Sequence, residues 1–566
     1  MKEPKELLGK AADPGFWAQF RTQSAQDCGK QFFENYREEL LKTWDTCCEG
    51  QPIPSLSYSD FALFFRTGDR AVYQRPYFAR RTAMETSALL SLIYPEEDKY
   101  IRYLMDVIFA VCDEYTWCLP AHQKQLDKND NCKVDLFASE TAFTLAEISV
   151  LLGERLDPLI RDRIRVEIDR RVISSVLSKE PYDWWEKTSN NWAAVCMGSV
   201  GCTVMLARPE LFETMKPRFE ATMGRFLGGF SEDGVCLEGC SYWHYGFGHF
   251  VYFADMIRRF TDGKIDYFAS PKVRKIAGFV QKMYLSGNAC VSFSDCGRSM
   301  SYHLGLLHYL KTEYPGEIKV YAPEMSYTGV GTLANHLRSA IWYNEEFYTH
   351  PDGQGDETFF SEDAGWLVKK TPAYGFAAKG GNNNEMHNHN DVGTFIFAKN
   401  GRQMITDIGK GTYTRQYFSS ERYSILQCSS RSHSVPLIGG QEQFDGKEAA
   451  AKETSFDGKT FRTEISGAYK AEGLTKLARS FTFDPEGVTM TDEIAYSGGE
   501  VTERFAALVK PECGDGAVTV DEARIEYDRA LCEPVINCEK TPEGTDCWFV
   551  DFVLPEGTGS FTVKIS

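Results

Sequence analysis

The stretch Gly381-Asn-Asn-Asn-Glu-Met-His387-Asn-His389-Asn-Asp391-Val-Gly393 concentrates two histidines, five amide side chains and two acids. Apolar runs flank it, and the following runs at residues 394–398 and 404–409 are β-rich and punctuated by turn residues. We therefore expect both imidazoles to lie at strand ends and not on a helix. So dense a group of polar side chains between two strands indicates a functional site.

Short alternating runs separated by Gly, Asn and Asp continue this pattern towards the C-terminus. They lie at residues 365–369, 374–378, 479–484, 487–492 and 548–553. Many short strands at such spacing are typical of an antiparallel β-sandwich. The helical period stops after Trp342, so we predict a β-sandwich domain at residues 341–566 that carries the histidine stretch.

The preceding part, residues 1–340, has the period of α-helices. Apolar residues recur at helical spacing in three segments: Ile101, Leu104, Met105, Ile108, Val111, Cys112 and Tyr115; Ile160, Ile164, Ile168, Val172 and Val176; Val273, Ile276, Val280 and Met283. Asp157-Pro158 and Ser270-Pro271 mark helix starts, and Asp262-Gly263 marks a helix end. Many antiparallel helices joined by aromatic loops favour an incomplete (α/α) toroid. A helical repeat array is the alternative, although no fixed period is visible.

Composition excludes several classes of partner. The 566 residues are 43% hydrophobic and carry a formal charge of −18. An acidic protein lacks the basic field that nucleic acids and anionic membranes require. No membrane span or signal peptide is visible, so we expect a cytoplasmic protein as the sequence stands, or a periplasmic or secreted one if a signal peptide has been removed. The 17 cysteines form no CxxC pair, which favours free thiols in a reducing compartment.

Four loops of the helical part are rich in Trp, Tyr and polar side chains. They lie at residues 117–122, 182–185, 189–192 and 238–246. Aromatic faces stack on sugar rings, while amides and hydroxyls bind the ring hydroxyls. Packing between helices explains any single loop better. The coincidence of four favours a carbohydrate cleft.

Five motifs then occur in a fixed order. They are Asn190-Asn191-Trp192; Asp233-Gly-Val-Cys-Leu-Glu238 leading to Tyr242-Trp-His-Tyr245; His387-Asn-His389-Asn-Asp391-Val-Gly393; Asp407-Ile-Gly409; and Ser432-His433-Ser-Val-Pro436. With the helical-then-β order, they resemble the heparinase II/III-like polysaccharide lyases, and the motifs of the β-rich part are the more specific. The resemblance implies β-elimination on a uronic acid, in which a base removes the C5 proton and the glycosidic oxygen leaves from C4.

The resemblance also implies four catalytic residues. Asn191 matches the position that neutralises the uronate carboxylate, which is needed because the C5 proton is too weakly acidic beside a charged carboxylate. A tyrosine acts as base, acid or both, provided that cationic or hydrogen-bonding neighbours lower its pKa of about 10. Tyr245 is favoured for this role, since it opens the helix after the loop that contains Glu238, and Tyr242 is the alternative. His387 matches the catalytic histidine, which acts as base toward one C5 epimer or assists neutralisation.

The family's metal ligands match His389, Asp407 and His433. Two neutral imidazoles and a carboxylate suit a divalent cation, with zinc the first expectation and manganese the second. The resemblance implies a structural metal that fixes the loop bearing His387. Spacing alone would leave each of the three as an ordinary polar residue.

Further residues are candidates for substrate contact. Trp192 stands where some relatives have a second histidine, which leaves the preferred uronate epimer open. Residues 66–81 hold five arginines and one acid, and pairing with surface acids is the alternative to binding a polyanion. The substrate-contact candidates are Trp192, Trp184, His122, His244, Arg80, Arg81 and Glu238.

We therefore predict a lyase of uronate-containing glycans, with glycosaminoglycans such as heparan sulfate, chondroitin or hyaluronan favoured and alginate or another oligouronide as the alternative. Two other classes stay open: a non-catalytic carbohydrate-binding toroid, and a hydrolase using two carboxylates among Asp183, Glu186 and Glu238. The sequence leaves sulfation preference, endo or exo action and oligomeric state open.

Overall fold

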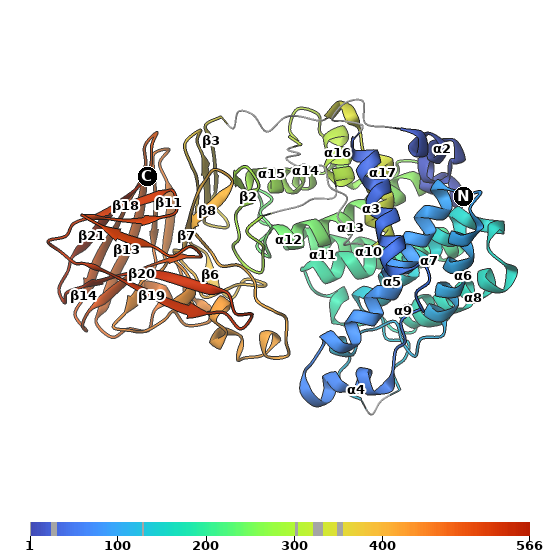
Figure 1. Cartoon of the computed structure of the whole chain (residues 1–566), viewed down its shortest axis with the longest axis horizontal. Coiled ribbons are helices and arrows are strands. Elements are labelled where there is room, and N and C mark those ends of the chain that lie inside the picture. Colours follow the sequence, from blue (N-terminus) through green and yellow to red (C-terminus); the bar gives the residue numbers. More distant parts are fainter. Residues whose placement is uncertain (1, 24–30, 127–128, 300–303, 321–331, 348–354) are drawn as a thin grey trace. The chain divides into compact units, whose positions relative to one another are not determined.

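The computed structural model describes residues 2–23, 31–126, 129–299, 304–320, 332–347 and 355–566. The chain forms two compact units. One comprises Met1–Gly229, His244–Arg274 and Ser301–His350, and the other Phe230–Trp243, Lys275–Met300 and Pro351–Ser566. We call them the helical unit and the β-rich unit (Figure 1).

The helical unit is built around two apolar helices, α7 and α10. Its helices are α1 (Pro4–Leu8), α2 (Pro14–Thr22), α3 (Gln31–Cys47), α4 (Tyr58–Thr67), α5 (Ala71–Ile93), α6 (Asp98–Cys112), α7 (Leu136–Leu152), α8 (Pro158–Ile168), α9 (Ser174–Leu177), α10 (Asn191–Ala207), α11 (Phe212–Gly228), α13 (Gly248–Phe260), α16 (Leu304–Glu313) and α17 (Leu333–Trp342). Helix α10 packs against α7, α11 and α13. A Cβ on Gly201 of α10 would lie 2.5 Å from the Phe253 ring, so glycine lets α13 approach closely.

The helical predictions are confirmed except at two positions of one stripe. Pro158 begins α8, Pro271 begins α14 (Pro271–Ala277), and Gly263 follows α13 with φ of 79°. The predicted apolar stripes are buried except at Met105, which is partly exposed, and at Tyr115, where the prediction is wrong. Helix α6 ends at Cys112, so Tyr115 lies in the following loop, where it is 48% exposed.

One segment, Leu136–Arg155, is long and apolar enough to cross a membrane by length and composition alone. Within the helical unit, 72% of its most apolar window is buried. A helix that is covered on nearly all sides by other helices is expected to be apolar all round. Its position in the core therefore accounts for its composition.

The β-rich unit consists of antiparallel sheets. The eight-stranded sheet has the order β11 (Glu453–Phe456), β12 (Thr460–Glu464), β13 (Leu474–Phe483), β14 (Val488–Tyr496), β21 (Ser560–Ile565), β18 (Ala523–Tyr527), β17 (Ala517–Val520) and β16 (Glu512–Gly514). The four-stranded sheet has the order β19 (Pro534–Lys540), β20 (Asp546–Leu554), β15 (Val501–Ala507) and β9 (Leu437–Ile438). The five-stranded sheet has the order β3 (Glu357–Ser361), β4 (Trp366–Lys370), β5 (Gly375–Lys379), β7 (Phe395–Lys399) and β8 (Arg402–Ile405). Two short pairs join β1 (Tyr284–Ser286) to β2 (Ala289–Cys290) and β6 (Asn382–Asn383) to β10 (Gly446–Ala450).

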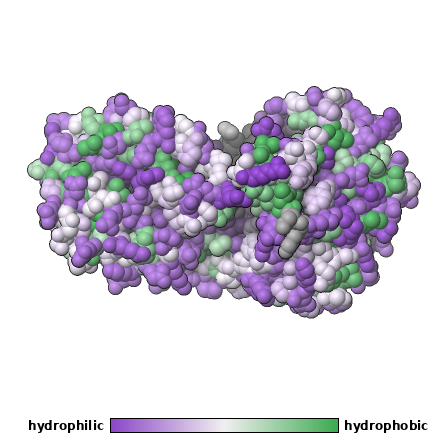
Figure 2. Space-filling view, turned by 90° about the horizontal axis from the view of Figure 1, so that it is seen from below, coloured by the Kyte–Doolittle hydropathy of each residue, from purple (hydrophilic) through white to green (hydrophobic). Residues whose placement is uncertain are grey.

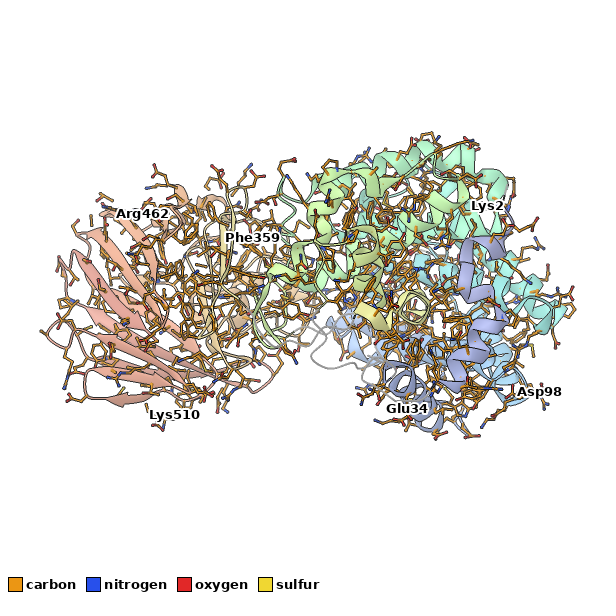
Figure 3. All side chains as sticks on the ribbon, turned by 90° about the horizontal axis from the view of Figure 1, so that it is seen from above. Lys2, Glu34, Asp98, Phe359, Arg462 and Lys510 are labelled. Carbon is orange, nitrogen blue, oxygen red and sulfur yellow. The ribbon has the colours of Figure 1, made fainter. Side chains whose placement is uncertain are left out.

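Inward-facing residues of these sheets form one hydrophobic core that includes Phe376, Phe395, Phe481, Phe505 and Phe552. The outward faces are polar: Arg462 of β12, labelled in Figure 3, pairs with Glu493 of β14. Figure 2 likewise shows a surface on which hydrophilic residues predominate and hydrophobic ones are scattered. Alternation along the strands thus separates core from solvent, as the sequence pattern predicts.

The two units do not coincide with the predicted domains, residues 1–340 and 341–566. Two earlier segments, Phe230–Trp243 and Lys275–Met300, join the β-rich unit. Strand β1 contacts β4, β5 and β7, and a Cβ on Gly375 of β5 would lie 2.2 Å from the carbonyl oxygen of Leu285. This close backbone approach needs glycine, and it attaches the second segment to the five-stranded sheet.

Candidate active site

Asp295 is the centre of a buried hydrogen-bond cluster in the β-rich unit. Its Oδ2 accepts a hydrogen bond from His387 Nδ1 at 2.8 Å, and its Oδ1 accepts one from His389 Nε2 at 3.1 Å. Burial alone would raise the pKa of this carboxyl, but the hydrogen bonds from both histidines and the positive charge of Arg422 hold it well below its usual range. Asp295 is therefore a carboxylate that orients both rings.

Two tyrosines and an arginine complete the cluster. The hydroxyls of Tyr413 and Tyr417 donate to Asp295 at 3.1 and 2.6 Å. Arg422 Nη2 donates to Asp295 Oδ1 at 3.0 Å and to the carbonyl oxygen of His387 at 3.2 Å. Arg422 thus ties the backbone of the histidine stretch to the buried carboxylate.

His387 lies in the loop between β6 and β7, as the sequence predicts, with φ of 60°. This left-handed conformation is uncommon for a residue with a Cβ and is typical of constrained functional loops. The Tyr242 ring stacks on the imidazole at 4.0 Å, and Glu238 Oε2 lies 3.7 Å from Nε2. Because Nδ1 donates to Asp295, Nε2 is the nitrogen that can accept a proton.

The hydroxyl of Tyr242 is part of the same network. It lies 2.6 Å from the hydroxyl of Tyr413, whose hydrogen is donated to Asp295. Tyr242 must therefore donate to Tyr413. Burial raises the pKa of Tyr242 well above its usual range, although the hydrogen bond with Tyr413 acts in the opposite direction. The proton of Tyr242 is held within the cluster.

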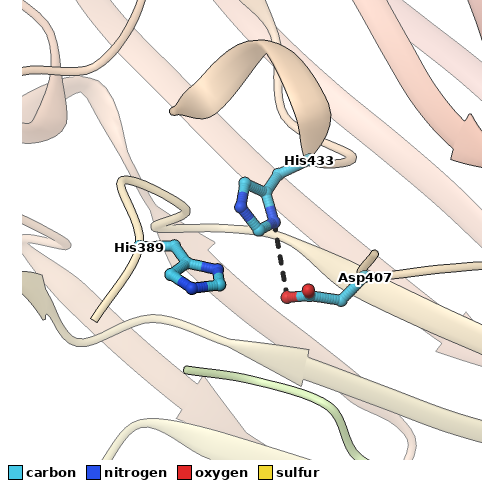
Figure 4. Close-up of side chains that lie close together, drawn as sticks. All are labelled: His389, Asp407 and His433. Carbon is cyan, nitrogen blue, oxygen red and sulfur yellow. Dashed lines mark ion pairs between the residues drawn. The ribbon is translucent and has the colours of Figure 1, made fainter. Parts of the chain in front are cut away.

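The predicted metal ligands His389, Asp407 and His433 lie together in the β-rich unit (Figure 4). All three are buried, and one ligand atom from each lies within 4.8 Å of the others. His433 Nε2 donates to the carbonyl oxygen of Gln427 at 3.1 Å, so its bare Nδ1 faces Asp407 Oδ2 at 3.3 Å. His389 likewise uses Nε2 for Asp295, which leaves its Nδ1 without a hydrogen-bond partner.

Three buried acceptor atoms that face one another need a cation or a proton between them. The second nitrogen of each histidine already has a hydrogen-bond acceptor, which is the usual arrangement around metal-bound imidazoles. The donor set of two imidazoles and one carboxylate therefore fits a divalent metal.

Two side chains anchor the loops that carry these ligands. Arg479 of β13 donates from Nη1 to the carbonyl oxygens of Gly393 and Ser434, at 3.0 and 2.7 Å. It is fully buried and pairs with Asp492 and Glu503. The loops bearing His389 and His433 are thus held by one cation of the sandwich core.

In the helical unit, Asn191 and Tyr245 are neighbours. Asn190 caps α10 by accepting from the amide of Trp192, which fixes Asn191 in the first turn, where it is 1% exposed. A Cβ on Gly246 would lie 3.0 Å from Asn191 Cβ, so glycine lets the turn after Tyr245 approach the asparagine. Tyr245 belongs to a π-helical turn, Trp243–Phe247, a geometry frequent at functional sites.

A buried acid–imidazole pair lies beside Tyr245. His249 Nδ1 donates to the carbonyl oxygen of Tyr245 at 2.9 Å, and Glu140 Oε1 lies 3.2 Å from His249 Nε2. Burial, followed by the negative charge of Glu140, raises the pKa of Tyr245 well above its usual range. The Tyr245 hydroxyl, although buried, has no hydrogen-bond partner among the described residues. The hydroxyl thus makes no well-formed hydrogen bond, although the nearby Glu140 carboxylate favours its protonated form.

The aromatic candidates also lie together in the helical unit. Trp184 packs on Trp192 with ring centroids 4.9 Å apart, and Trp192 packs on His122 at 4.8 Å. His122 Nδ1 lies 2.6 Å from Asp135, which fixes its ring. The three rings form a partly exposed group that begins at the residue after Asn191.

Arg80 and Arg81 do not have the role proposed for them. Arg81 is buried and forms a bidentate pair with Glu114 at 2.6 and 2.7 Å. Arg80 donates to Pro54 O at 2.6 Å and to Glu114 at 3.2 Å. Both guanidinium groups are therefore hydrogen-bonded within the helical unit. This agrees with the alternative that the arginines pair with acids, although Glu114 is buried and is not a surface acid.

The other candidates have mixed outcomes. Burial and the charge of His249 lower the pKa of His244 to about 4, so it is neutral at pH 7. Asp183 caps Trp184, and Glu186 pairs with Arg218 and accepts from the amide of Tyr182. These uses disfavour the two-carboxylate hydrolase. Glu238 lies in the β-rich unit beside His387.

Sequence reasoning missed Asp295, Tyr413, Tyr417 and Arg422, as well as the Glu140–His249 pair. The only signal in the sequence was the group of three tyrosines at 413, 417 and 423, in a segment without helical or strand period. Asp295 comes from a segment nearly 100 residues away from the histidines, and its nearest neighbours in sequence have no recognisable motif.

Residues 355–540 match the family profile described as "Heparinase II/III-like, C-terminal". No curated protein matches the chain. A mutant heparan sulfate lyase from Pedobacter heparinus is 12% identical with a TM-score of 0.60, over 96% of this chain and 84% of that chain. The chondroitin AC lyase of Streptomyces coelicolor A3, in complex with chondroitin sulphate, is 10% identical with a TM-score of 0.57, over 99% and 82%. A Paenibacillus xanthan lyase is 8% identical with a TM-score of 0.54, over 97% and 59%.

At these identities the likeness to solved structures shows the fold. It confirms the predicted class, an incomplete (α/α) toroid followed by antiparallel β-sheets. The profile match confirms the resemblance that the motifs of the β-rich part indicated.

Proposed function

Because residues 355–540 carry a heparinase II/III-like C-terminal domain, we propose that this protein is a polysaccharide lyase that cleaves uronate-containing glycans by β-elimination. The observation that carries the proposal is Tyr245, whose buried hydroxyl lacks a hydrogen-bond partner among the described residues and whose turn packs against Asn191. An amide beside a protonated phenol that makes no well-formed hydrogen bond suits a reaction that needs carboxylate neutralisation and proton donation.

Asn191 donates hydrogen bonds to the uronate carboxylate, so that negative charge can develop at C5. His387 Nε2 takes the C5 proton, the released electron pair forms the C4–C5 double bond, and the C4–O bond breaks. Tyr245 then gives its proton to the leaving oxygen. Burial and Glu140 raise the pKa of Tyr245, against the expectation that its neighbours lower it, so the phenol stays protonated at neutral pH and is proposed as the proton donor only, not as the base.

In the β-rich unit, Asp295 and Tyr242 hold the His387 ring. His389, Asp407 and His433 would bind a divalent cation, zinc or manganese, which supplies a fixed positive charge when bound. The cation is proposed as structural, because its ligands are fully buried and His387 is on the neighbouring turn.

Glycosaminoglycans are the proposed substrate class, with alginate-type uronans as the alternative. The heparan sulfate and chondroitin lyases among the similar structures support the first choice. The test is ultraviolet absorbance of unsaturated uronate during incubation with heparan sulfate, chondroitin sulfate, hyaluronan and alginate. A rise with at least one glycan is expected. Reducing ends without that absorbance would show a hydrolase, and binding without either product would show a carbohydrate-binding protein.

A further inference from the structure

Among the described residues, three polar atoms at the centre of the helical unit are buried without a well-formed hydrogen bond. They are the Tyr245 hydroxyl, Glu140 Oε1 and His249 Nε2. Glu140 Oε1 lies 3.2 Å from His249 Nε2, and the same carboxylate is close enough to act on the Tyr245 hydroxyl. Unsatisfied polar groups in a buried place are costly, so three of them close together need a reason.

The three side chains are held by rigid elements. Glu140 lies in α7, and His249 lies in the first turn of α13. His249 Nδ1 donates to the carbonyl oxygen of Tyr245 at 2.9 Å, which leaves Nε2 for Glu140. A Cβ on Gly198 of α10 would lie 3.2 Å from the carbonyl oxygen of His249, so glycine lets the start of α13 pack directly on α10. The Glu140–His249 pair is therefore fixed against the helix whose first turn carries Asn191.

The Tyr245 phenol needs help to release its proton. Burial raises its pKa well above its usual range, and the neighbouring groups Glu140, Cys196 and Asp135 raise it further. A phenolate beside an ionised carboxylate would place two like charges in a buried site, which is strongly disfavoured. Glu140 and His249, in contrast, can share one proton between Oε1 and Nε2. Transfer from Tyr245 to a leaving group therefore requires that another proton reach the phenol at the same time.

Resting on the lyase function proposed above, we propose that Glu140 and His249 form a proton relay that resupplies Tyr245 while Tyr245 protonates the leaving oxygen. The Tyr245 O–H bond breaks as an O–H bond forms on the leaving oxygen. The proton shared by Glu140 and His249 moves to the phenol oxygen in the same step. Tyr245 stays a neutral phenol, and the pair ends as a carboxylate and a neutral imidazole. It regains its proton from water after the product leaves. Both residues act through Tyr245 and touch no substrate.

The test compares two leaving groups in full-length variants. Glu140→Gln removes the transferable proton at nearly unchanged size, and His249→Gln removes the group that shares it. With a natural glycan, kcat should fall about 10²-fold in Glu140→Gln and about tenfold in His249→Gln, with KM little changed. A uronide whose C4 substituent is nitrophenoxide needs no proton on the leaving group. Both variants should cleave it as fast as the wild type, as measured by the absorbance of released nitrophenoxide.

Rates in mixtures of light and heavy water give a second readout, which a purely structural role would not change. Two protons move together in the wild type, so kcat for the natural glycan should depend on the fraction of heavy water along a curve. In Glu140→Gln only one proton moves, and the dependence should become linear. The matched control is Glu147→Gln, which removes another buried acid of α7, one that pairs with Arg338 at 2.7 Å. It should lower stability and keep the curve.

Product formation by the wild type with unchanged kcat in Glu140→Gln overturns the relay alone. Equal losses with the two leaving groups, or a linear dependence in the wild type, also overturn it, because the pair would then only support the structure. If Glu140→Gln does not fold, the same comparisons in His249→Gln decide. Absence of unsaturated product from every glycan with the wild type overturns the lyase function, and the relay with it.

Discussion

Tyr242 and Tyr245 are three residues apart, yet their hydroxyls have opposite surroundings. Tyr242 donates to Tyr413 within the network of Asp295, whereas the Tyr245 hydroxyl is buried with no hydrogen-bond partner among the described residues. Leaving such a group unsatisfied costs about 1–3 kcal/mol, so its persistence needs a reason. The difference teaches that Tyr242 is suited to holding His387, and Tyr245 to exchanging a proton with a ligand.

The largest expected effect separates the two tyrosines directly. Tyr245→Phe should lower kcat about 10³-fold, because it removes the proposed proton donor. Tyr242→Phe keeps the ring that stacks on His387 and should lower kcat only about tenfold. Initial rates of unsaturated-product formation measure both. Equal losses, or a larger loss in Tyr242→Phe, would reverse the assignment.

Asp295→Asn tests the hydrogen-bond cluster that contains Tyr242 and His387. An amide can accept at only one of its two ends, so either His387 or His389 loses its acceptor, and the His387 ring can change tautomer. We expect kcat to fall about 10²-fold with KM little changed. Asp515→Asn is the matched control, since its carboxylate is exposed and pairs only with Arg529 among the described residues. Unchanged kcat in Asp295→Asn would remove this residue from the site.

Metal removal tests the predicted metal site of the β-rich unit through the free energy of unfolding. At a metal concentration 100 times Kd, binding adds about 2.7 kcal/mol to the free energy of unfolding, and a chelator should remove it. Thermal melts and metal analysis of wild type and His433→Ala check this. The wild type should hold one divalent ion and lose stability on chelation, while His433→Ala should respond to neither. An identical response of the two proteins would contradict the predicted ligand set.

The smallest expected effect concerns Glu543, which accepts from the amide of Thr412 at 2.6 Å and from Gln427 at 2.7 Å. Burial alone would raise its pKa, but the hydrogen bonds from Thr412 lower the pKa of Glu543 to about 2. The folded pKa lies below the unfolded value of about 4.3, so this stabilisation is present above that pH and is lost as the pH falls toward 2.

Glu543→Gln should therefore lower the unfolding free energy by about 1 kcal/mol at pH 7, a figure reduced for the exposure of the side chain. The difference from wild type should shrink as the pH falls below about 4. Denaturant unfolding at several pH values measures it. A difference independent of pH would show that the carboxylate charge is not involved.

Much of the fold could be predicted because its signals are local. Period-two runs become strands such as β13 and β20, and proline starts and glycine ends bound α8 and α13. The ligands His389, Asp407 and His433 could be proposed from motifs, and the structure brings them within 4.8 Å of one another. In each case the decisive information lies within a few neighbouring residues.

The rest depends on contacts that no local pattern encodes. Asp295 reaches the histidines only because Leu285 packs against Gly375 and attaches its segment to the five-stranded sheet. The predicted substrate contact of Arg80 and Arg81 fails for the same reason. Their partner Glu114 lies more than 30 residues later in the sequence, just after α6. The helical spacing of these arginines does not reveal which faces inward.

Arg479 has a consequence for how the protein is assembled. Its charge is neutralised by Asp492 of β14 and Glu503 of β15, and its other donors hold the backbone after His389 and after His433. The two loops can take their final positions only once β13, β14 and β15 have come together. Uptake of the metal is thus expected as a late event during maturation, and metal content becomes a measure of whether the sandwich has been completed.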